Sequence, residues 1–143
     1  MKICIIGAGA MGGLYGTRLI MAGEEVHFVD NRQSVVDNIN QQGVHLTGVD
    51  GEHWIPAKAS VTASDFFPAD IAFIHTDTNN SAAAAIQANA VLDKQDGWCI
   101  TFQNGIGNVE KLQHELGIER VAGGISYHSA CLLYTSPSPR DRG

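Results

Sequence analysis

The residues best suited to do chemistry lie in the first dozen positions. An apolar run, residues 2–6, leads directly into Gly7-Ala8-Gly9-Ala10-Met11-Gly12. In such a turn the first glycine permits a tight strand-to-helix turn, the second lets a pyrophosphate approach the backbone, and the third lets the helix pack closely on the strand. Free N–H groups at the start of the helix can bind the anion. The pattern predicts a dinucleotide site formed by Gly7, Ala8, Gly9, Ala10, Met11 and Gly12.

The sequence after this turn favours that interpretation over an ordinary glycine-rich turn. Apolar residues recur at helical spacing at Leu14, Leu19 and Ile20, and Gly23 stands where a helix cap belongs. The run 26–29 then indicates a second strand that ends at Asp30. The motif therefore has the strand, helix and strand context that it needs.

The second predicted strand is followed by Asp30, Asn31 and Arg32. These residues are consistent with two different cofactors. An acidic residue at this place accepts hydrogen bonds from the adenosine ribose hydroxyls, which suits NAD. A guanidinium two residues later can hold a 2′-phosphate through charge-assisted bonds, which suits NADP. Arg32 is equally consistent with a solvated surface side chain. The residues alone leave NADP, NAD and a surface role open.

Two further strand ends carry polar residues. His75-Thr76-Asp77 follows the apolar run 69–74, and Gln103-Asn104-Gly105 follows the run 98–102. Ligands in a parallel sheet bind at the carboxyl ends of the strands, so Thr76 and Asn104 are candidate cofactor contacts. Asn104 can present its amide to the nicotinamide side of a ligand. It can equally well be a turn residue that accepts a sharp backbone angle.

The remaining elements alternate between strand and helix. The pattern predicts a short helix over 33–42 capped by Gly43, and a hairpin over 44–55 that ornaments the fold. It further predicts a buried strand over 69–74, a helix from about 79–81 to 92, a strand over 98–102, a helix over 108–116 and a strand over 121–125. This order predicts an α/β fold of the Rossmann type, a doubly wound parallel sheet with helices on both faces.

Composition narrows the classes of function. The chain has 143 residues, of which 44% are hydrophobic, which suits one globular domain without a membrane span. The formal net charge is −6 and no Lys/Arg cluster occurs, so a nucleic-acid partner is disfavoured. Neither the cysteines nor the histidines have metal-ligand spacing, and Cys4 and Cys99 are expected to be small core residues. The chain begins without a targeting leader, and we expect it to be cytoplasmic.

The last thirteen residues differ in character from the rest. Residues 131–143 resemble the translation of a transposase-based sequencing adapter, with a natural Pro/Ser-rich linker as the alternative. We therefore expect a dinucleotide-binding domain over 1–130 and a non-native tail over 131–143.

Two motifs together support a family resemblance. The opening through Gly12, with Leu14-Tyr15-Gly16, and the segment 103–108 resemble the N-terminal domain of 2-dehydropantoate 2-reductase, also called ketopantoate reductase. The likeness covers residues 1 to about 130. It implies NADPH-dependent reduction of a 2-keto acid, 2-dehydropantoate, to D-pantoate on the route to pantothenate and coenzyme A.

The resemblance also assigns roles by position. It implies that Gly7 to Gly12 bind the pyrophosphate, that Asn104 contacts both nicotinamide and substrate, and that Ala130 touches the cofactor through its backbone. The proton-donating lysine of the family and its partner glutamate belong to a helical C-terminal domain that these residues do not include. No catalytic residue is therefore assigned here, and the fragment is expected to be inactive.

Two positions depart from the family pattern. Asn31 stands where the family often has arginine, with Arg32 one step later, and the lysine that the family usually carries shortly after the strand at 69–74 is absent. These departures keep two alternatives in view, an NAD(P)-dependent dehydrogenase of another keto or hydroxy acid and a non-catalytic dinucleotide-binding module. A short-chain dehydrogenase is disfavoured because neither Tyr15 nor Tyr127 begins a Tyr-x-x-x-Lys pair.

Overall fold

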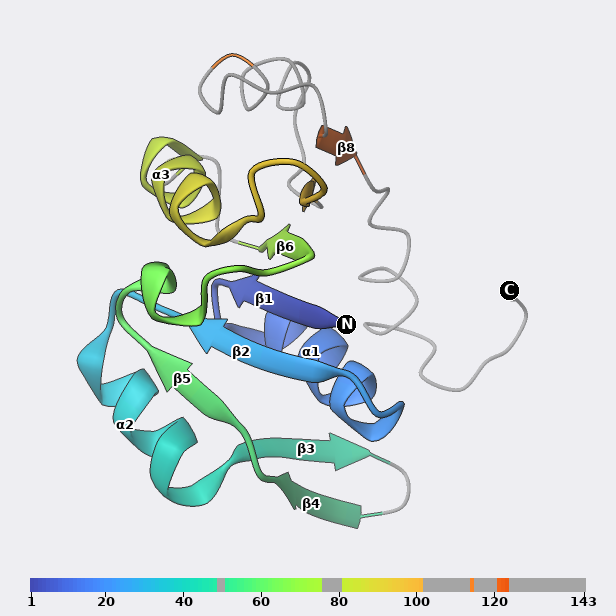
Figure 1. The fold of residues 1–143 in the computed structure, drawn as a ribbon. Coiled ribbons are helices and arrows are strands. Elements are labelled where there is room, and N and C mark those ends of the chain that lie inside the picture. Colours follow the sequence, from blue (N-terminus) through green and yellow to red (C-terminus); the bar gives the residue numbers. More distant parts are fainter. Residues whose placement is uncertain (49–50, 76–80, 102–113, 115–120, 124–143) are drawn as a thin grey trace.

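The computed structural model describes residues 1–48, 51–75, 81–101, 114 and 121–123 (Figure 1). Six parallel strands form one sheet in the order β5-β2-β1-β6-β7-β8. These strands are β1 (Lys2–Ile6), β2 (Glu25–Val29), β5 (Lys58–Ser60), β6 (Ile71–Ile74), β7 (Trp98–Thr101) and β8 (Val121–Gly123). Strand order reverses between β1 and β6, which is where ligands bind in doubly wound sheets. The predicted Rossmann-type α/β fold is confirmed.

The helices whose full length lies within the described residues are α1 (Ala10–Met21), α2 (Gln33–Gln42) and α3 (Ser81–Val91), with a short 3-10 turn, η1 (Ala63–Phe66). Val36 and Ile39 are buried on one side of α2, as the spacing of its apolar residues predicts. Gly23 and Gly43 have positive φ angles at the ends of α1 and α2, which confirms both predicted caps.

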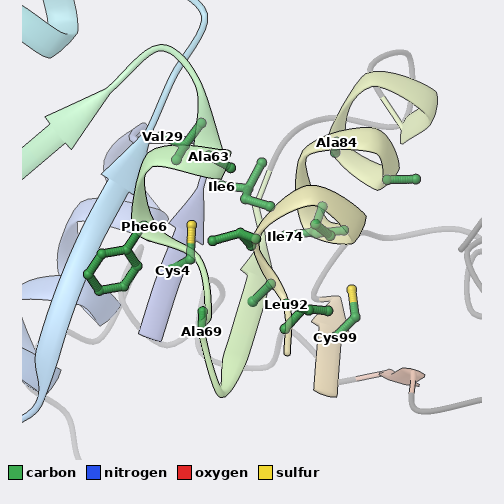
Figure 2. Close-up of a cluster of buried hydrophobic side chains, with 14 of the residues drawn as sticks. Cys4, Ile6, Val29, Ala63, Phe66, Ala69, Ile74, Ala84, Leu92 and Cys99 are labelled. Carbon is green, nitrogen blue, oxygen red and sulfur yellow. The ribbon is translucent and has the colours of Figure 1, made fainter. Parts of the chain in front are cut away.

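Alternate residues of the central strands pack into two separate hydrophobic cores, one on each face of the sheet. Ile3 and Ile5 of β1 lie in the core on the α2 side, together with Phe28 of β2. Cys4 and Ile6 point to the opposite face and pack with η1 and α3 (Figure 2). This alternation is the two-residue period of a strand with both faces covered. The thiols of Cys4 and Cys99 are buried and unpaired, which confirms their expected core role.

Helix α1 packs closely on the sheet at two of its glycines, Gly12 and Gly16. A Cβ added at Gly12 would stand 2.1 Å from the carbonyl oxygen of Gly7. One added at Gly16 would stand 2.3 Å from Cζ of Phe28, a fully buried side chain. The close-packing role predicted for Gly12 is confirmed. The similar role of Gly16, one helical turn later, was not predicted.

The predicted hairpin is confirmed as an antiparallel pair, β3 (Val44–Gly48) and β4 (Gly51–Ile55), outside the main sheet. Strand β5, which follows it, was not predicted and forms an edge of the six-stranded sheet. The side chain of Asn40 in α2 accepts a hydrogen bond from the N–H of Ala59 at 2.8 Å and donates one to its carbonyl oxygen at 3.0 Å. The amide thus pairs with this edge as a neighbouring strand would, and joins α2 to β5.

Several predicted elements lie partly or wholly outside the described residues. The strand predicted over 98–102 is described as far as Thr101, and the one over 121–125 as far as Gly123. The helix predicted over 108–116 is described only at His114, and the tail 131–143 not at all.

The paired hydrogen bonds of Asn40 give a stability prediction. We expect Asn40→Ala to lower the free energy of unfolding by roughly 1 to 3 kcal/mol, because both backbone groups of Ala59 lose their side-chain partner. Chemical denaturation measures this change. Gln41→Ala, at the next and also exposed position of α2, is the matched control. An equal effect of the two variants would contradict the role given to Asn40.

Candidate cofactor-binding site

The glycine-rich turn joins the end of β1 to the start of α1. Gly7 has a φ angle of +104°, a conformation that favours glycine, and its N–H donates to the carbonyl oxygen of Val29 at 2.8 Å. Gly9 is the N-cap of α1, with an extended backbone and no capping side chain. A Cβ added at Gly9 would find no atom within 4 Å. The first turn of α1 is therefore open to an incoming group.

Asp30, at the end of β2, ties this turn to the next. Its Oδ2 accepts a hydrogen bond from the N–H of Ala8 at 3.0 Å, and its Oδ1 accepts one from the N–H of Arg32 at 3.0 Å. The guanidinium of Arg32 bridges both oxygens, with Nε to Oδ1 at 2.8 Å and Nη2 to Oδ2 at 2.9 Å. Arg32 above all, and then the backbone bonds, lower the pKa of Asp30 against the effect of its burial. The carboxylate is therefore ionised at neutral pH.

A hollow of about 410 Å³ lies over the carboxyl ends of β1 and β2. That volume is within the range of small-molecule sites. Its walls come from the glycine-rich turn, the loop after β2, the segment before η1, the end of β6 and helix α3. The lining residues are Ile6, Gly7, Gly9, Val29, Asp30, Asn31, Arg32, Val61, His75, Ala83, Ala84 and Gln87. The hollow thus joins the turn to the point where strand order reverses.

His75 forms the part of this wall that follows β6. Its N–H donates to the carbonyl oxygen of Ile6 at 2.9 Å, and its ring lies 5.2 Å from that of Tyr15, centroid to centroid. Burial lowers the pKa of the imidazole from 6.5 to about 4. His75 is therefore neutral at physiological pH and adds no positive charge to the hollow.

Gln87 of α3 holds the opposite wall, a role that sequence reasoning missed. Its side-chain oxygen accepts a hydrogen bond from the N–H of Ala63 at 2.8 Å, and its nitrogen donates to the carbonyl oxygen of Val61 at 3.4 Å. These bonds join α3 to the segment between β5 and η1. A polar residue within an alanine-rich helix was the available signal, but the sequence does not indicate which loop it meets.

The structure brings together five of the residues predicted for the site, Gly7, Gly9, Asp30, Asn31 and Arg32, around one hollow. Ala8 contributes its N–H to Asp30, Ala10 begins α1, and Gly12 packs against Gly7 beneath the turn. Met11 lies in the first turn of α1. Thr76, Asn104 and Ala130 lie outside the described residues.

A second hollow, of about 420 Å³, lies between α1, α2 and the hairpin. Its lining includes Leu14, Phe28 and Ile39, and its rim includes His45, whose ring stacks on that of Trp54 at 4.4 Å. It shares Gly9 with the first hollow, but the Asp30 and Arg32 side chains do not line it.

Comparison with known proteins identifies the family. The family model described as "Ketopantoate reductase PanE/ApbA" matches residues 3–135. The chain belongs to the ketopantoate reductase family. A 2-dehydropantoate 2-reductase of Pyrococcus horikoshii is 36% identical over 132 residues, which are 92% of this chain and 42% of the relative. One from Pyrococcus abyssi is 32% identical over 130 residues, 91% of this chain and 41% of the relative.

Solved structures agree with this assignment. The 2-dehydropantoate 2-reductase of Geobacter metallireducens GS-15 superposes with a TM-score of 0.78 at 29% identity, covering 87% of this chain and 41% of that one. The chain therefore spans about 40% of the length of the ketopantoate reductases that it matches. Members of this family are oxidoreductases that bind a nicotinamide dinucleotide and a keto acid.

Two kinds of feature are absent from the part of the chain that the structure describes. No helix there is long and apolar enough to cross a membrane. No group of three or more His, Cys, Asp or Glu side chains in the described ranges is placed to hold a metal ion.

The buried imidazole predicts a pH dependence of stability. Because the pKa of His75 is about 4 in the folded chain and has its ordinary value of 6.5 after unfolding, the unfolded chain binds more protons between these values. The contribution of His75 to the free energy of unfolding is therefore fully present above about pH 6.5. It is lost as the pH falls towards 4, by at most about 3 kcal/mol. Chemical denaturation across this range measures the loss.

Two variants separate this effect from other titrations. His75→Phe keeps an aromatic ring beside Tyr15 and should show a smaller loss of stability over the same pH range. His53→Gln, at an exposed position of the hairpin, is the control. A His75→Phe variant whose stability falls as steeply as that of the parent would contradict the explanation.

Proposed function

We propose that this chain is the cofactor-binding half of an NADPH-dependent reductase that converts 2-dehydropantoate into D-pantoate, a step towards pantothenate and coenzyme A. The observation that carries the proposal is the start of α1, where the space beside the Cα of Gly9 is open, next to a hollow that reaches Arg32. Membership of the ketopantoate reductase family and relatives named for this reaction support the substrate.

The cofactor would lie across the end of the sheet. Its pyrophosphate would approach Gly9 and accept hydrogen bonds from free N–H groups at the start of α1. Its adenosine would enter the hollow between the loop after β2 and α3. The guanidinium of Arg32, whose side chain is 60% exposed, would meet the 2′-phosphate.

The nicotinamide and the keto acid would lie farther along the ends of β6 and β7. Thr76 would contact the cofactor, Asn104 would contact both nicotinamide and substrate, and Ala130 would contact the cofactor through its backbone. The nicotinamide supplies a hydride, and the role of the protein is to hold the ring against the keto carbon. The neutral ring of His75 would lie between the adenosine side and the nicotinamide side of the cofactor.

The reaction also needs groups that this part of the sequence does not supply. We infer a dinucleotide-binding domain over 1–130, a non-native tail over 131–143, and a missing helical domain that carries the proton donor and orients the keto acid. The chain spans about 40% of its relatives, which supports the missing domain. By itself the chain would bind the dinucleotide without reducing the keto acid.

A second candidate is an NAD-linked dehydrogenase of another keto or hydroxy acid. The observation that favours it is Asp30, a carboxylate held at the end of β2 by the N–H of Ala8. A ribose without a 2′-phosphate would use that acceptor. Parallel calorimetric titrations of NADPH and NADH into the 143-residue chain discriminate the two, since tighter NADPH binding supports the first candidate and tighter NADH binding the second.

A methyl group at Gly9 tests the location of the site. We expect Gly9→Ala to weaken NADPH binding by about ten-fold or more, because the methyl would occupy the space that the pyrophosphate needs. The fold should tolerate it, since Gly9 has a φ angle of −80° and open surroundings. Calorimetry measures the affinity, and the thermal midpoint should move by no more than a few degrees.

The same substitution at Gly16 is the matched control. There a methyl collides with Phe28, so Gly16→Ala should lower stability by about 1 to 3 kcal/mol. Normal NADPH affinity in Gly9→Ala would remove the basis of the proposed site.

A further inference from the structure

The carboxylate of Asp30 already has as many hydrogen bonds as its oxygens readily accept. Four N–H groups point at it, two on each oxygen, from the backbone of Ala8 and from the backbone, Nε and Nη2 of Arg32. An ionised carboxylate has about four lone-pair sites. In this arrangement the ribose hydroxyls of NADH would find the acceptor at the end of β2 occupied.

The two partners of this ion pair are held very differently. The Asp30 side chain is 5% exposed and is fixed by two backbone N–H groups, whereas the Arg32 side chain is 60% exposed. Within the described part of the chain, the guanidinium donates its hydrogen bonds only to Asp30. The carboxylate is therefore the fixed element and the guanidinium the removable one.

We propose that Arg32 determines cofactor preference by covering Asp30, so that it disfavours NADH as well as attracting the 2′-phosphate of NADPH. The inference rests on the proposed dinucleotide site. NADH would have to displace two charge-assisted hydrogen bonds before its ribose could reach the carboxylate. NADPH would leave that pair in place and use the N–H groups of the guanidinium that face away from Asp30. Arg32 would thus select NADPH partly by making NADH binding less favourable.

Arg32→Ala gives the two dinucleotides opposite responses. We expect NADPH to bind about ten-fold more weakly, because its phosphate loses a cation, and NADH to bind about five-fold more tightly, because the carboxylate is uncovered. Loss of a positive charge alone would weaken both anionic ligands. A gain for NADH would therefore point to the uncovered carboxylate of Asp30, which the double variant below tests. Calorimetric titration of each dinucleotide into the full 143-residue chain provides the four affinities.

Two further variants isolate the cause. Arg18→Ala removes another exposed cation, from the last turn of α1, and should give NADH no gain. Asp30→Asn combined with Arg32→Ala should abolish the gain, because the amide cannot replace the carboxylate as a two-oxygen acceptor. Thermal melts of all variants check that each is folded.

The outcomes separate the inference from the function on which it rests. If the parent chain melts cooperatively but binds neither dinucleotide, the proposed function fails, and the inference fails with it. If the parent prefers NADPH but Arg32→Ala leaves NADH affinity unchanged or weaker, the function stands and the covering role is wrong. A tighter NADH complex that requires Asp30 supports the inference.

Discussion

The site depends on how closely helix α1 lies over the sheet. Gly12 faces the carbonyl oxygen of Gly7, and Gly16 faces the ring of Phe28, at distances that no Cβ could share. This contact places the first turn of α1 directly above the end of β1. The first N–H groups of a helix have no partner within it, and this turn borders the hollow beside β1 and β6, where the strand order reverses and a doubly wound sheet binds its ligands.

A second constraint holds the turn after β2 against the turn after β1. Asp30 is buried at the end of β2, and a buried carboxylate is stable only when donors surround it. The N–H of Ala8 and the Arg32 pair satisfy that need, so the turns after β1 and β2 are joined through one side chain. Asp30 therefore supplies a polar group to the wall of the hollow and holds the exposed guanidinium of Arg32 in place.

Much of this architecture could be predicted from the sequence, because the signals are local. Glycines mark the turn after β1 and the ends of α1 and α2, and the period of the apolar residues distinguishes helix from strand. Strand β5 was missed because it has three residues and depends on Asn40, which no periodicity reveals. The same holds for Gly16, Gln87 and the Asp30–Arg32 pair, since each depends on a partner brought close only by the fold.

Whether the glycine-rich turn holds a dinucleotide can be tested by NMR. Amide resonances of the chain, uniformly labelled with ¹⁵N, would be followed while NADPH is added. We expect the largest shifts on Gly7, Gly9 and Arg32, which line the hollow at the ends of β1 and β2. Shifts concentrated instead on Leu46 and Trp54, in the hollow beside the hairpin, would contradict a dinucleotide site at this turn.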